Sequence, residues 1–353
     1  MICPYEPGRP IESVRRELGL KRIVKLASNE NPLGPSPRVV AALNRADLRL
    51  HLYPDHEGLS LRAAIARHDG VPESSLMLGA GSSDLMRMIA EAYLDRGDEG
   101  VVPDLCFPLY ETVVRLAGAR PVVAPVDAEL RIDLQRTLDA VNRRTRVVFL
   151  ATPNNPTALG LPTADLVRFL EELPQRVLCV LDLAYGDYRE EVHDPSRLVE
   201  RFPNLVLLKT FSKVFALAGL RIGYAVAAEA VIRWMDRARI PFGTSSASHL
   251  AAKVALGDSA HVARSVELNR RARSELASGL ERLGLKVQPS QANFVLADLG
   301  RSAEPVFQEL LRRGVIVRPM RHSRISTCLR ITTGTLAQQK MMLGALDEVL
   351  ARA

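Results

Sequence analysis

A chain of 353 residues, of which 47% are hydrophobic and 25% charged, can bury a large core and exceeds the length at which a single core usually keeps growing, so two domains are expected. The net charge of +7 comes from arginines that are scattered among acidic residues and form no basic block, which favours small anionic ligands over nucleic acid as partners. The start of the chain has no basic segment followed by an apolar one, and no stretch approaches about eighteen uninterrupted apolar residues, so we expect a soluble, cytoplasmic protein without a membrane partner.

The first forty residues are rich in proline and glycine and contain no long periodic segment. We expect them to wrap over the surface or to lie along a partner. Beyond them, short apolar runs alternate with amphipathic segments, which is typical of an α/β fold with a mostly parallel sheet. The expected strands are 76–78, 100–102, 121–123, 146–150, 177–181 and 205–208, and the expected helices between them include 83–94 and 163–173.

The pattern changes after Arg221. Long helical stretches follow at 245–256 and 261–283, and a mixture of strands and helices fills 287–352. This change predicts a second, smaller domain. The expected division is an N-terminal arm with part of the small domain (1–45), a large domain (46–250) and a small C-terminal domain (251–353).

The four cysteines give no sign of a metal site or of a disulfide framework. They lie far apart, with no C-x-x-C pair and no histidine at metal-ligand spacing. Cys179 stands inside the apolar run 177–181, where a core position is expected. We expect no bound metal and reduced thiols at Cys3, Cys106, Cys179 and Cys328.

Ligands of doubly wound sheets bind beyond the carboxyl ends of the strands, so polar residues directly after apolar runs are the candidate site residues. Ser82 and Ser83 follow a Gly-Ala-Gly turn and open a helix, where backbone amides, hydroxyls and the positive helix end can bind a phosphate. An ordinary helix start explains the same residues. The turn 152–157 follows another strand, and the Asn155 amide there can donate to a ring oxygen or belong to a rigid turn without a ligand.

Asp182 ends the apolar run 177–181, where an unpaired carboxylate would be costly, so it needs a cationic partner. A pyridinium N–H would serve, because the ion pair keeps that nitrogen protonated and lets the ring accept electrons. An arginine of the chain itself is the alternative partner. Tyr185 stands three residues later, and Phe107 can stack on an aromatic cofactor or belong to the core.

Lys213 follows the apolar strand 204–208 and lies eight residues before Arg221, with the hydroxyls of Thr210 and Ser212 close to it in sequence. This layout suits a lysine that forms a Schiff base with a phosphorylated aldehyde cofactor. Only seven of the 47 basic residues are lysines, so an incidental surface charge would more often have been arginine. The alternative is that Lys213 and Lys209 are two solvated cations near a helix start.

With these residues assembled, the chain resembles the fold-type I pyridoxal-phosphate aminotransferases, and within that group it is most similar to the histidinol-phosphate aminotransferases. The resemblance implies an α/β fold with a mostly parallel seven-stranded sheet between helices and a smaller α/β domain. It runs nearly end to end, through the segments 5–11, 26–35, 53–55, 154–157, 210–221, 292–295 and 329–332.

The resemblance implies pyridoxal 5′-phosphate as the cofactor and a role for each matching residue. Lys213 matches the Schiff-base lysine, which also carries a proton between the substrate and the cofactor. Asp182 matches the partner of the pyridine nitrogen, and Asn155 and Tyr185 match the donors to the 3-oxygen. Phe107 matches the stacking aromatic. The phosphate-binding positions match Ser82, Ser83, Thr210, Ser212 and Arg221.

The resemblance further implies a homodimer with shared active sites. Tyr53 matches a residue that reaches the phosphate bound by the neighbouring subunit. Arg330 matches the arginine that holds the carboxylate of glutamate, and Arg318 stands where a further contact to the anionic end of the substrate is made. Asn29 lies in the segment that closes over the site and is assigned to the substrate. Arginines 321 and 324 either extend this cluster or belong to a basic surface loop.

The expected reaction is a ping-pong transamination between histidinol phosphate and 2-oxoglutarate, a step of histidine biosynthesis. The chain departs from the family pattern at Ser83, Leu105, Ala158 and Leu183, which removes no catalytic atom but leaves the substrate open. An aromatic amino-acid aminotransferase would share every cofactor residue, and a threonine-phosphate decarboxylase would share the framework. A non-catalytic, nucleic-acid-binding protein is the alternative of another class, and the intact Lys213 argues against it.

Overall fold

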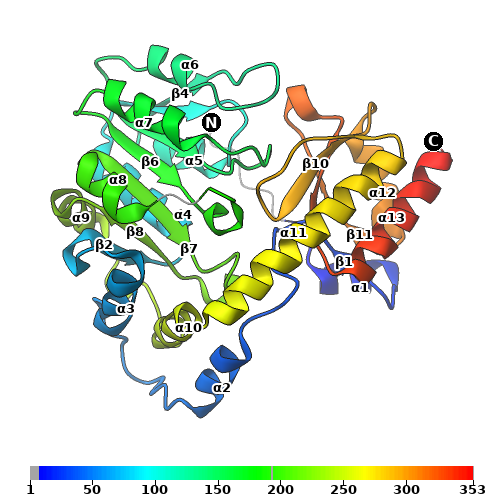
Figure 1. Cartoon of the computed structure of the whole chain (residues 1–353), viewed down its shortest axis with the longest axis horizontal. Helices are drawn as coiled ribbons and strands as arrows, with labels where there is room; N and C mark the ends of the chain where they lie inside the picture. Colours follow the sequence, from blue (N-terminus) through cyan, green and yellow to red (C-terminus); the bar gives the residue numbers. More distant parts are fainter. Residues whose placement is uncertain (1–7, 192–193, 353) are drawn as a thin grey trace.

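The computed structural model describes residues 8–191 and 194–352. A larger and a smaller sheet organise the chain, and the long helix α11 (Ser259–Arg282) extends from the part that holds the larger sheet to the part that holds the smaller one (Figure 1). Cys3 and the start of the 5–11 motif lie outside the described residues.

The larger sheet has seven strands in the spatial order β2-β8-β7-β6-β5-β3-β4. β8 runs antiparallel to its neighbours β2 and β7, and all other neighbours are parallel. The expected mostly parallel sheet is therefore confirmed. Its strands are β2 (Leu76–Gly79), β3 (Glu99–Pro103), β4 (Arg120–Ala124), β5 (Thr145–Ala151), β6 (Leu178–Asp182), β7 (Leu205–Thr210) and β8 (Gly223–Ala227).

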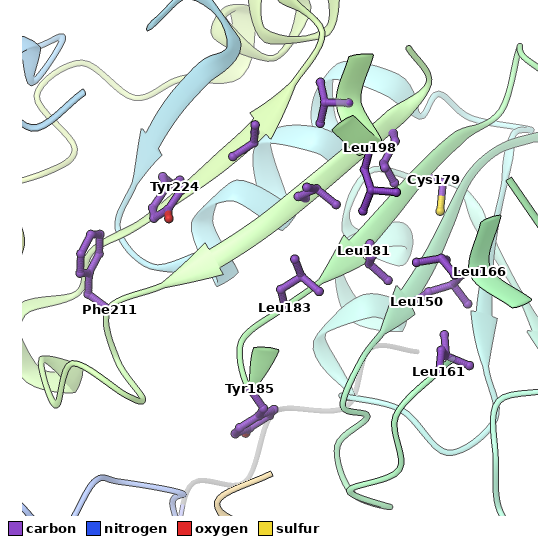
Figure 2. Close-up of a cluster of buried hydrophobic side chains, with 14 of the residues drawn as sticks. Leu150, Leu161, Leu166, Cys179, Leu181, Leu183, Tyr185, Leu198, Phe211 and Tyr224 are labelled. Atoms are coloured by element: carbon purple, nitrogen blue, oxygen red, sulfur yellow. The ribbon is translucent and has the colours of Figure 1, made fainter. Parts of the chain in front are cut away.

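The central strands are apolar on both faces because both faces are covered. Successive residues of β5 enter opposite cores: Val148 and Leu150 belong to one, whereas Val147 and Phe149 belong to the other. Figure 2 shows part of the first core, which includes Cys179 as expected. This two-sided burial explains why the sequence reads as continuous apolar runs.

Three of the helices around this sheet start at a residue whose side chain caps the first turn: Asp133, Asp194 and Ser245. The Ser245 hydroxyl accepts a hydrogen bond from the Ser248 backbone N–H, and the Ser248 side chain accepts from the Ser245 N–H, which fixes the first turn of α10. The helices expected at 83–94, 163–173 and 245–256 are confirmed. The helices are α3 (Leu59–Asp69), α4 (Ser82–Tyr93), α5 (Leu109–Leu116), α6 (Leu134–Asp139), α7 (Thr163–Glu172), α8 (Pro195–Arg201), α9 (Glu229–Met235) and α10 (Ser246–Leu256), with 3₁₀ turns η1 (Glu73–Ser75), η2 (Gly186–Tyr188), η3 (Ala218–Leu220) and η4 (Asp236–Ala238).

The smaller sheet is antiparallel, in the order β12-β13-β10-β9, and a separate parallel pair joins β1 to β11. Its core is distinct from the two cores of the larger sheet. The elements here are β9 (Lys286–Val287), β10 (Phe294–Asp298), α12 (Ala303–Arg312), β11 (Val315–Ile316), β12 (Arg318–Pro319), η5 (Ser323–Ile325), β13 (Cys328–Thr332) and α13 (Leu336–Ala351).

The first forty residues hold more regular structure than expected. They contain α1 (Ile11–Leu18) and β1 (Val24–Lys25), and α2 (Pro37–Arg45) begins after the Ser36 cap. These helices span only two to three turns, so they show no clear helical period in the sequence. Tertiary packing of single residues such as Val14 stabilises them. The absence of a long periodic segment therefore did not indicate an absence of helices.

Three of the four buried hydrophobic clusters support the expected division into domains, which stays a proposal, whereas the fourth, with Leu105 and Leu296, joins the two parts. α10 contacts α2 and α3, and Ala251, Ala252 and Ala255 belong to a core of the larger sheet. We therefore propose a boundary after α10, beyond the expected residue 250. Among residues 8–191 and 194–352, no helix has the length and apolar character required to cross a membrane.

Candidate active site

A cavity of about 270 Å³ lies at the carboxyl ends of β5, β6 and β7. Parallel strands bring the residues that follow them to one edge of the sheet, which is why side chains far apart in sequence meet here. Of the fourteen candidate site residues, twelve line this cavity: Asn29, Ser82, Ser83, Phe107, Asn155, Asp182, Tyr185, Thr210, Ser212, Lys213, Arg221 and Arg330.

One end of the cavity is built to hold an anion. Ser82 and Ser83 form the first turn of α4, after Gly81 with φ of 84°. A Cβ atom at Gly81 would lie 2.6 Å from Nη2 of Arg221, so glycine permits the guanidinium to approach the helix start. Nη1 of Arg221 also donates to the Ser212 hydroxyl at 3.3 Å. Helix amides, hydroxyls and a guanidinium thus converge on one place.

The Asp182 carboxylate lies deep in the cavity at the end of β6. Its Oδ1 accepts from the Ala184 backbone N–H at 2.9 Å, and its Oδ2 accepts from the Tyr110 hydroxyl at 2.8 Å. Burial raises the pKa of Asp182, and the Tyr110 hydrogen bond and the Lys213 charge counteract this only in part. A cationic ring nitrogen beside the carboxylate would favour its ionised form, so the site fits a protonated pyridine.

Tyr110 is a site residue that the sequence interpretation missed. Its ring is buried, stacks on Phe149 with centroids 5.3 Å apart, and meets the edge of Phe107 at 5.9 Å. Burial raises the pKa of Tyr110 well above its usual value, so the hydroxyl stays protonated and can donate to Asp182. Its position three residues after Phe107 was the only available signal.

The Lys213 amine faces the cavity and does not belong to the solvated surface. Its Nζ donates to the Ser28 carbonyl at 3.3 Å and lies 5.6 Å from the centroid of the Tyr185 ring. Lys209 is not a solvated cation either: its Nζ is 3.1 Å from both carboxylate oxygens of Asp69, which also accepts from Tyr224 at 2.9 Å. The two lysines therefore have separate environments.

The turn after β5 presents Asn155 to the cavity. The neighbouring Asn154 side chain is used inside the turn, where its Nδ2 donates to the Leu105 carbonyl at 2.6 Å and to the Thr157 hydroxyl at 3.0 Å. Oδ1 of Asn155 accepts from Nη1 of Arg330 at 2.6 Å. The amide nitrogen is therefore the part of Asn155 that can donate to a ligand.

The segment between β1 and α2 closes one side of the cavity. Each carbonyl from Leu26 to Asn29 accepts a hydrogen bond from another part of the chain. The donors, in order, are Thr332 N at 2.9 Å, Arg330 Nη2 at 2.7 Å, Lys213 Nζ at 3.3 Å and Asn293 Nδ2 at 3.0 Å. The segment is thus fixed to the smaller sheet, through β13 and the residue before β10, and to the candidate catalytic lysine.

Two candidate residues do not line the cavity. Tyr53 is 82% exposed and stacks on Phe242 with centroids 4.6 Å apart, so within one chain it contributes nothing to the site. Its contribution to a neighbouring subunit stays a prediction. Arg318 lines an adjoining cavity of about 500 Å³, whose lining shares Phe107, Asn155 and Arg330 with the first.

The other two arginines of the expected basic cluster differ from each other. Arg321 lines the adjoining cavity and lies 3.7 Å from Glu304. Arg324 lines neither cavity, because its guanidinium donates to the carbonyls of Val126 and Asp127. Within the described residues, no group of three or more histidine, cysteine, aspartate or glutamate side chains could hold a metal ion.

Comparison with known proteins gives consistent matches over the whole chain. The model of a family described as aminotransferase class I and II matches residues 21–346. A Moorella thermoacetica protein named histidinol-phosphate aminotransferase is 44% identical, with 99% of this chain and 91% of that protein covered. A protein of the same name from Anaeromyxobacter sp. is 43% identical over 99% of this chain and 97% of its own length.

A solved structure extends this match to three dimensions. The crystal structure of histidinol-phosphate aminotransferase from Sinorhizobium meliloti, in complex with pyridoxal-5′-phosphate, superposes with a TM-score of 0.93 and 30% identity. The alignment covers 98% of this chain and 96% of that one.

Proposed function

Because the chain belongs to the class I and II aminotransferase family, we propose that it uses pyridoxal 5′-phosphate to transfer the amino group of histidinol phosphate to 2-oxoglutarate. The observation that carries the proposal is the cavity itself, in which a lysine amine, a buried carboxylate and an anion-binding helix start face one another. The full-length similarity to histidinol-phosphate aminotransferases supports the substrate assignment.

The residues present fit this cofactor. The α4 start, Ser212 and Arg221 would hold its phosphate, and Asp182 would face its ring nitrogen. The face of Phe107 would cover the ring, and the Asn155 amide would donate to the ring oxygen. When bound, the cofactor supplies a reactive aldehyde and a ring that accepts electrons from the substrate.

The chain's own groups supply proton transfer and charge stabilisation. The Lys213 amine is the proposed acceptor of the proton on the substrate α-carbon and the group that returns it. At the base of the cavity, Tyr110 and the Ala184 N–H both donate to Asp182. Burial raises the pKa of Asp182, and these donors counteract part of that effect, so they favour the ionised carboxylate.

Both substrates carry an anion remote from the reacting carbon, a phosphate in one and a carboxylate in the other. Arg330 is the proposed carboxylate ligand, and its contacts with Asn155 and with the Ala27 carbonyl restrict the guanidinium before any substrate arrives. Arg318 in the adjoining cavity is the proposed second contact. A restricted guanidinium loses less conformational entropy on binding.

The amino donor can be identified directly. The purified, cofactor-loaded protein is mixed with single amines in the absence of an oxo acid, and loss of its visible absorption is followed. Histidinol phosphate should convert the enzyme at far lower concentration than phenylalanine. Preference for phenylalanine would instead indicate an aromatic amino-acid aminotransferase, and release of carbon dioxide from phosphothreonine without an oxo acid would indicate a decarboxylase.

We also propose a homodimer. Large apolar side chains are exposed around Tyr53, and Phe242, which stacks on it, is still 43% exposed. Burial of this surface against a second copy would bring Tyr53 to the partner's cavity. The exposed residues are Leu50, Leu52, Tyr53, Ile240 and Phe242. Light scattering of the purified protein tests this proposal, and a monomeric mass would contradict it.

A further inference from the structure

Three consecutive hydrogen bonds link the Asn29 backbone N–H, through the Thr332 hydroxyl and the Asn29 side chain, to the Tyr185 hydroxyl. Its backbone N–H donates to Oγ1 of Thr332 at 2.9 Å. The Thr332 hydroxyl donates to Oδ1 of Asn29 at 3.0 Å, and Nδ2 of Asn29 donates to the Tyr185 hydroxyl at 2.9 Å. Asn29 and Thr332 are only 1% and 3% exposed, so water has little access to these groups.

The two hydrogen bonds of Thr332 set the orientation of the Asn29 amide. The Thr332 oxygen accepts from the Asn29 backbone N–H, and within residues 8–191 and 194–352 Oδ1 of Asn29 is the only acceptor for its single hydrogen. The amide oxygen of Asn29 therefore faces Thr332, and the amide nitrogen faces Tyr185. The network thus settles an amide orientation that distance alone would leave open.

This orientation determines what the Tyr185 hydroxyl can do. Its oxygen accepts from Asn29, so its hydrogen cannot point to Asn29 and turns elsewhere. Within residues 8–191 and 194–352, the Tyr185 hydroxyl makes no second protein hydrogen bond. Tyr185 lines the cavity and its ring is buried, so the cavity is the remaining direction for that hydrogen.

We propose that Asn29 and Thr332 are positioning residues that turn the phenolic hydrogen of Tyr185 into the cavity, toward the ring oxygen of the bound cofactor. The inference rests on the proposed function. It assigns the Asn29 amide to Tyr185, whereas the resemblance assigned Asn29 to the substrate. The φ of 54° at Asn29 lies in the left-handed region, which asparagine tolerates better than most residues, so the backbone also suits this residue.

The expected effect concerns the pH at which the visible absorption of the cofactor-loaded protein titrates. A donor to the ring oxygen reduces the negative charge there, so the oxygen attracts a neighbouring proton less strongly. Loss of the donor should raise the midpoint pH of this titration by about one pH unit, which is the size expected for the loss of one hydrogen bond to a charged group. This titration needs no substrate and no turnover.

The test compares Asn29→Gly, which removes the amide without strain at positive φ, with Thr332→Val and Tyr185→Phe. All three should raise the midpoint, whereas Thr332→Ser, which keeps the hydroxyl, should restore the wild-type value. Asn29→Gly should produce no further shift in the Tyr185→Phe protein, because Asn29 acts through that hydroxyl. An added shift of similar size in the double variant would overturn the proposal.

Asn293→Ala is the matched control, because Asn293 binds the Asn29 carbonyl and not its side chain. It should lower the unfolding temperature and leave the midpoint of the pH titration unchanged. A shift equal to that of Asn29→Gly would mean that a loosened segment, and not the loss of the Asn29 amide, causes the shift. An unchanged midpoint in Asn29→Gly together with a raised KM for the oxo acid would contradict the proposal and support a role of Asn29 in substrate binding. If wild-type protein gains no visible absorption with pyridoxal phosphate, the proposed function fails first.

Discussion

The Tyr110 hydroxyl donates to Oδ2 of Asp182 at 2.8 Å, and both residues are buried. The contact joins the start of α5 to the end of β6, across 72 residues of sequence. Because Asp182 also accepts from the Ala184 N–H, both of its oxygens have a donor before any ligand binds. A carboxylate prepared in this way can face a cation without a rearrangement of the protein.

Tyr110→Phe removes one of these donors and leaves a buried carboxylate oxygen unsatisfied. We expect the free energy of unfolding of the cofactor-free protein to fall by about 1–3 kcal/mol. The pKa of Asp182 should rise, because burial already raises it and the Tyr110 hydrogen bond lowers it. Urea unfolding measures the loss of stability. Titration with pyridoxal phosphate measures the weaker cofactor binding that we expect when Asp182 is less readily ionised. Wild-type stability together with wild-type affinity would show that the hydrogen bond has no role.

Arg221→Ala should weaken binding of pyridoxal phosphate to the cofactor-free protein. The guanidinium lies beside Gly81 and Ser212, so its loss removes a charge-assisted contact to the phosphate. We expect about a tenfold to hundredfold increase in Kd, measured by equilibrium dialysis. Arg233→Ala, on an exposed arginine of α9, is the control for net charge. Equal losses of affinity in the two variants would argue against a specific contact.

Arg330→Lys should impair recognition of the oxo acid. Lysine keeps the charge but has a single nitrogen in place of the two guanidinium nitrogens that bind Asn155 and the Ala27 carbonyl, and it lacks the planar fork that matches a carboxylate. Steady-state kinetics should show about a tenfold or greater loss in kcat/KM for 2-oxoglutarate. Full activity with lysine at this position would mean that charge alone suffices there.

Asp69 should make the stability of the protein depend on acid pH. Burial raises the pKa of Asp69, but hydrogen bonds from His68 and Tyr224 and the Lys209 charge outweigh it, so the pKa lies below its usual value. A lowered folded-state pKa gives stability that is present above the unfolded-state pKa and lost as the pH falls through the folded value, that is, below about pH 4.

Asp69→Asn tests this dependence, because it leaves Lys209 without its buried partner. The variant should lose roughly 3 kcal/mol of unfolding free energy at neutral pH. Its stability should then fall less than that of the wild type between neutral pH and pH 3. Urea unfolding at several pH values gives both quantities, and parallel pH curves for the two proteins would refute the role of Asp69.

The residues at the strand ends could be predicted from the sequence, because an apolar run that stops at a polar residue marks the edge of a parallel sheet. Lys213, Asp182 and Asn155 all follow such runs, and the structure brings them to one cavity. The expected strands and the mostly parallel order were readable for the same reason. The choice of substrate and the formation of a dimer depend on the shapes of pockets and surfaces, which the spacing of apolar residues does not reveal.

Other features depend on partners that the sequence does not bring together. Lys209 binds Asp69 across 140 residues, so its ion pair could not be distinguished from a solvated charge. The Asn29 amide meets Tyr185 across 156 residues, and its orientation follows only from the contact with Thr332. The short helices α1 and α2 were missed because tertiary packing, and not local periodicity, stabilises helices of this length.

In the proposed function, the Lys213 amine forms the covalent link to the cofactor. The most direct measurement is the visible spectrum of Lys213→Ala after incubation with pyridoxal phosphate and dialysis, with Lys253→Ala, on an exposed lysine of α10, as the control. Lys253→Ala should keep the wild-type absorption and turnover, and Lys213→Ala should lose both. A wild-type spectrum with normal turnover in Lys213→Ala would contradict this role of Lys213.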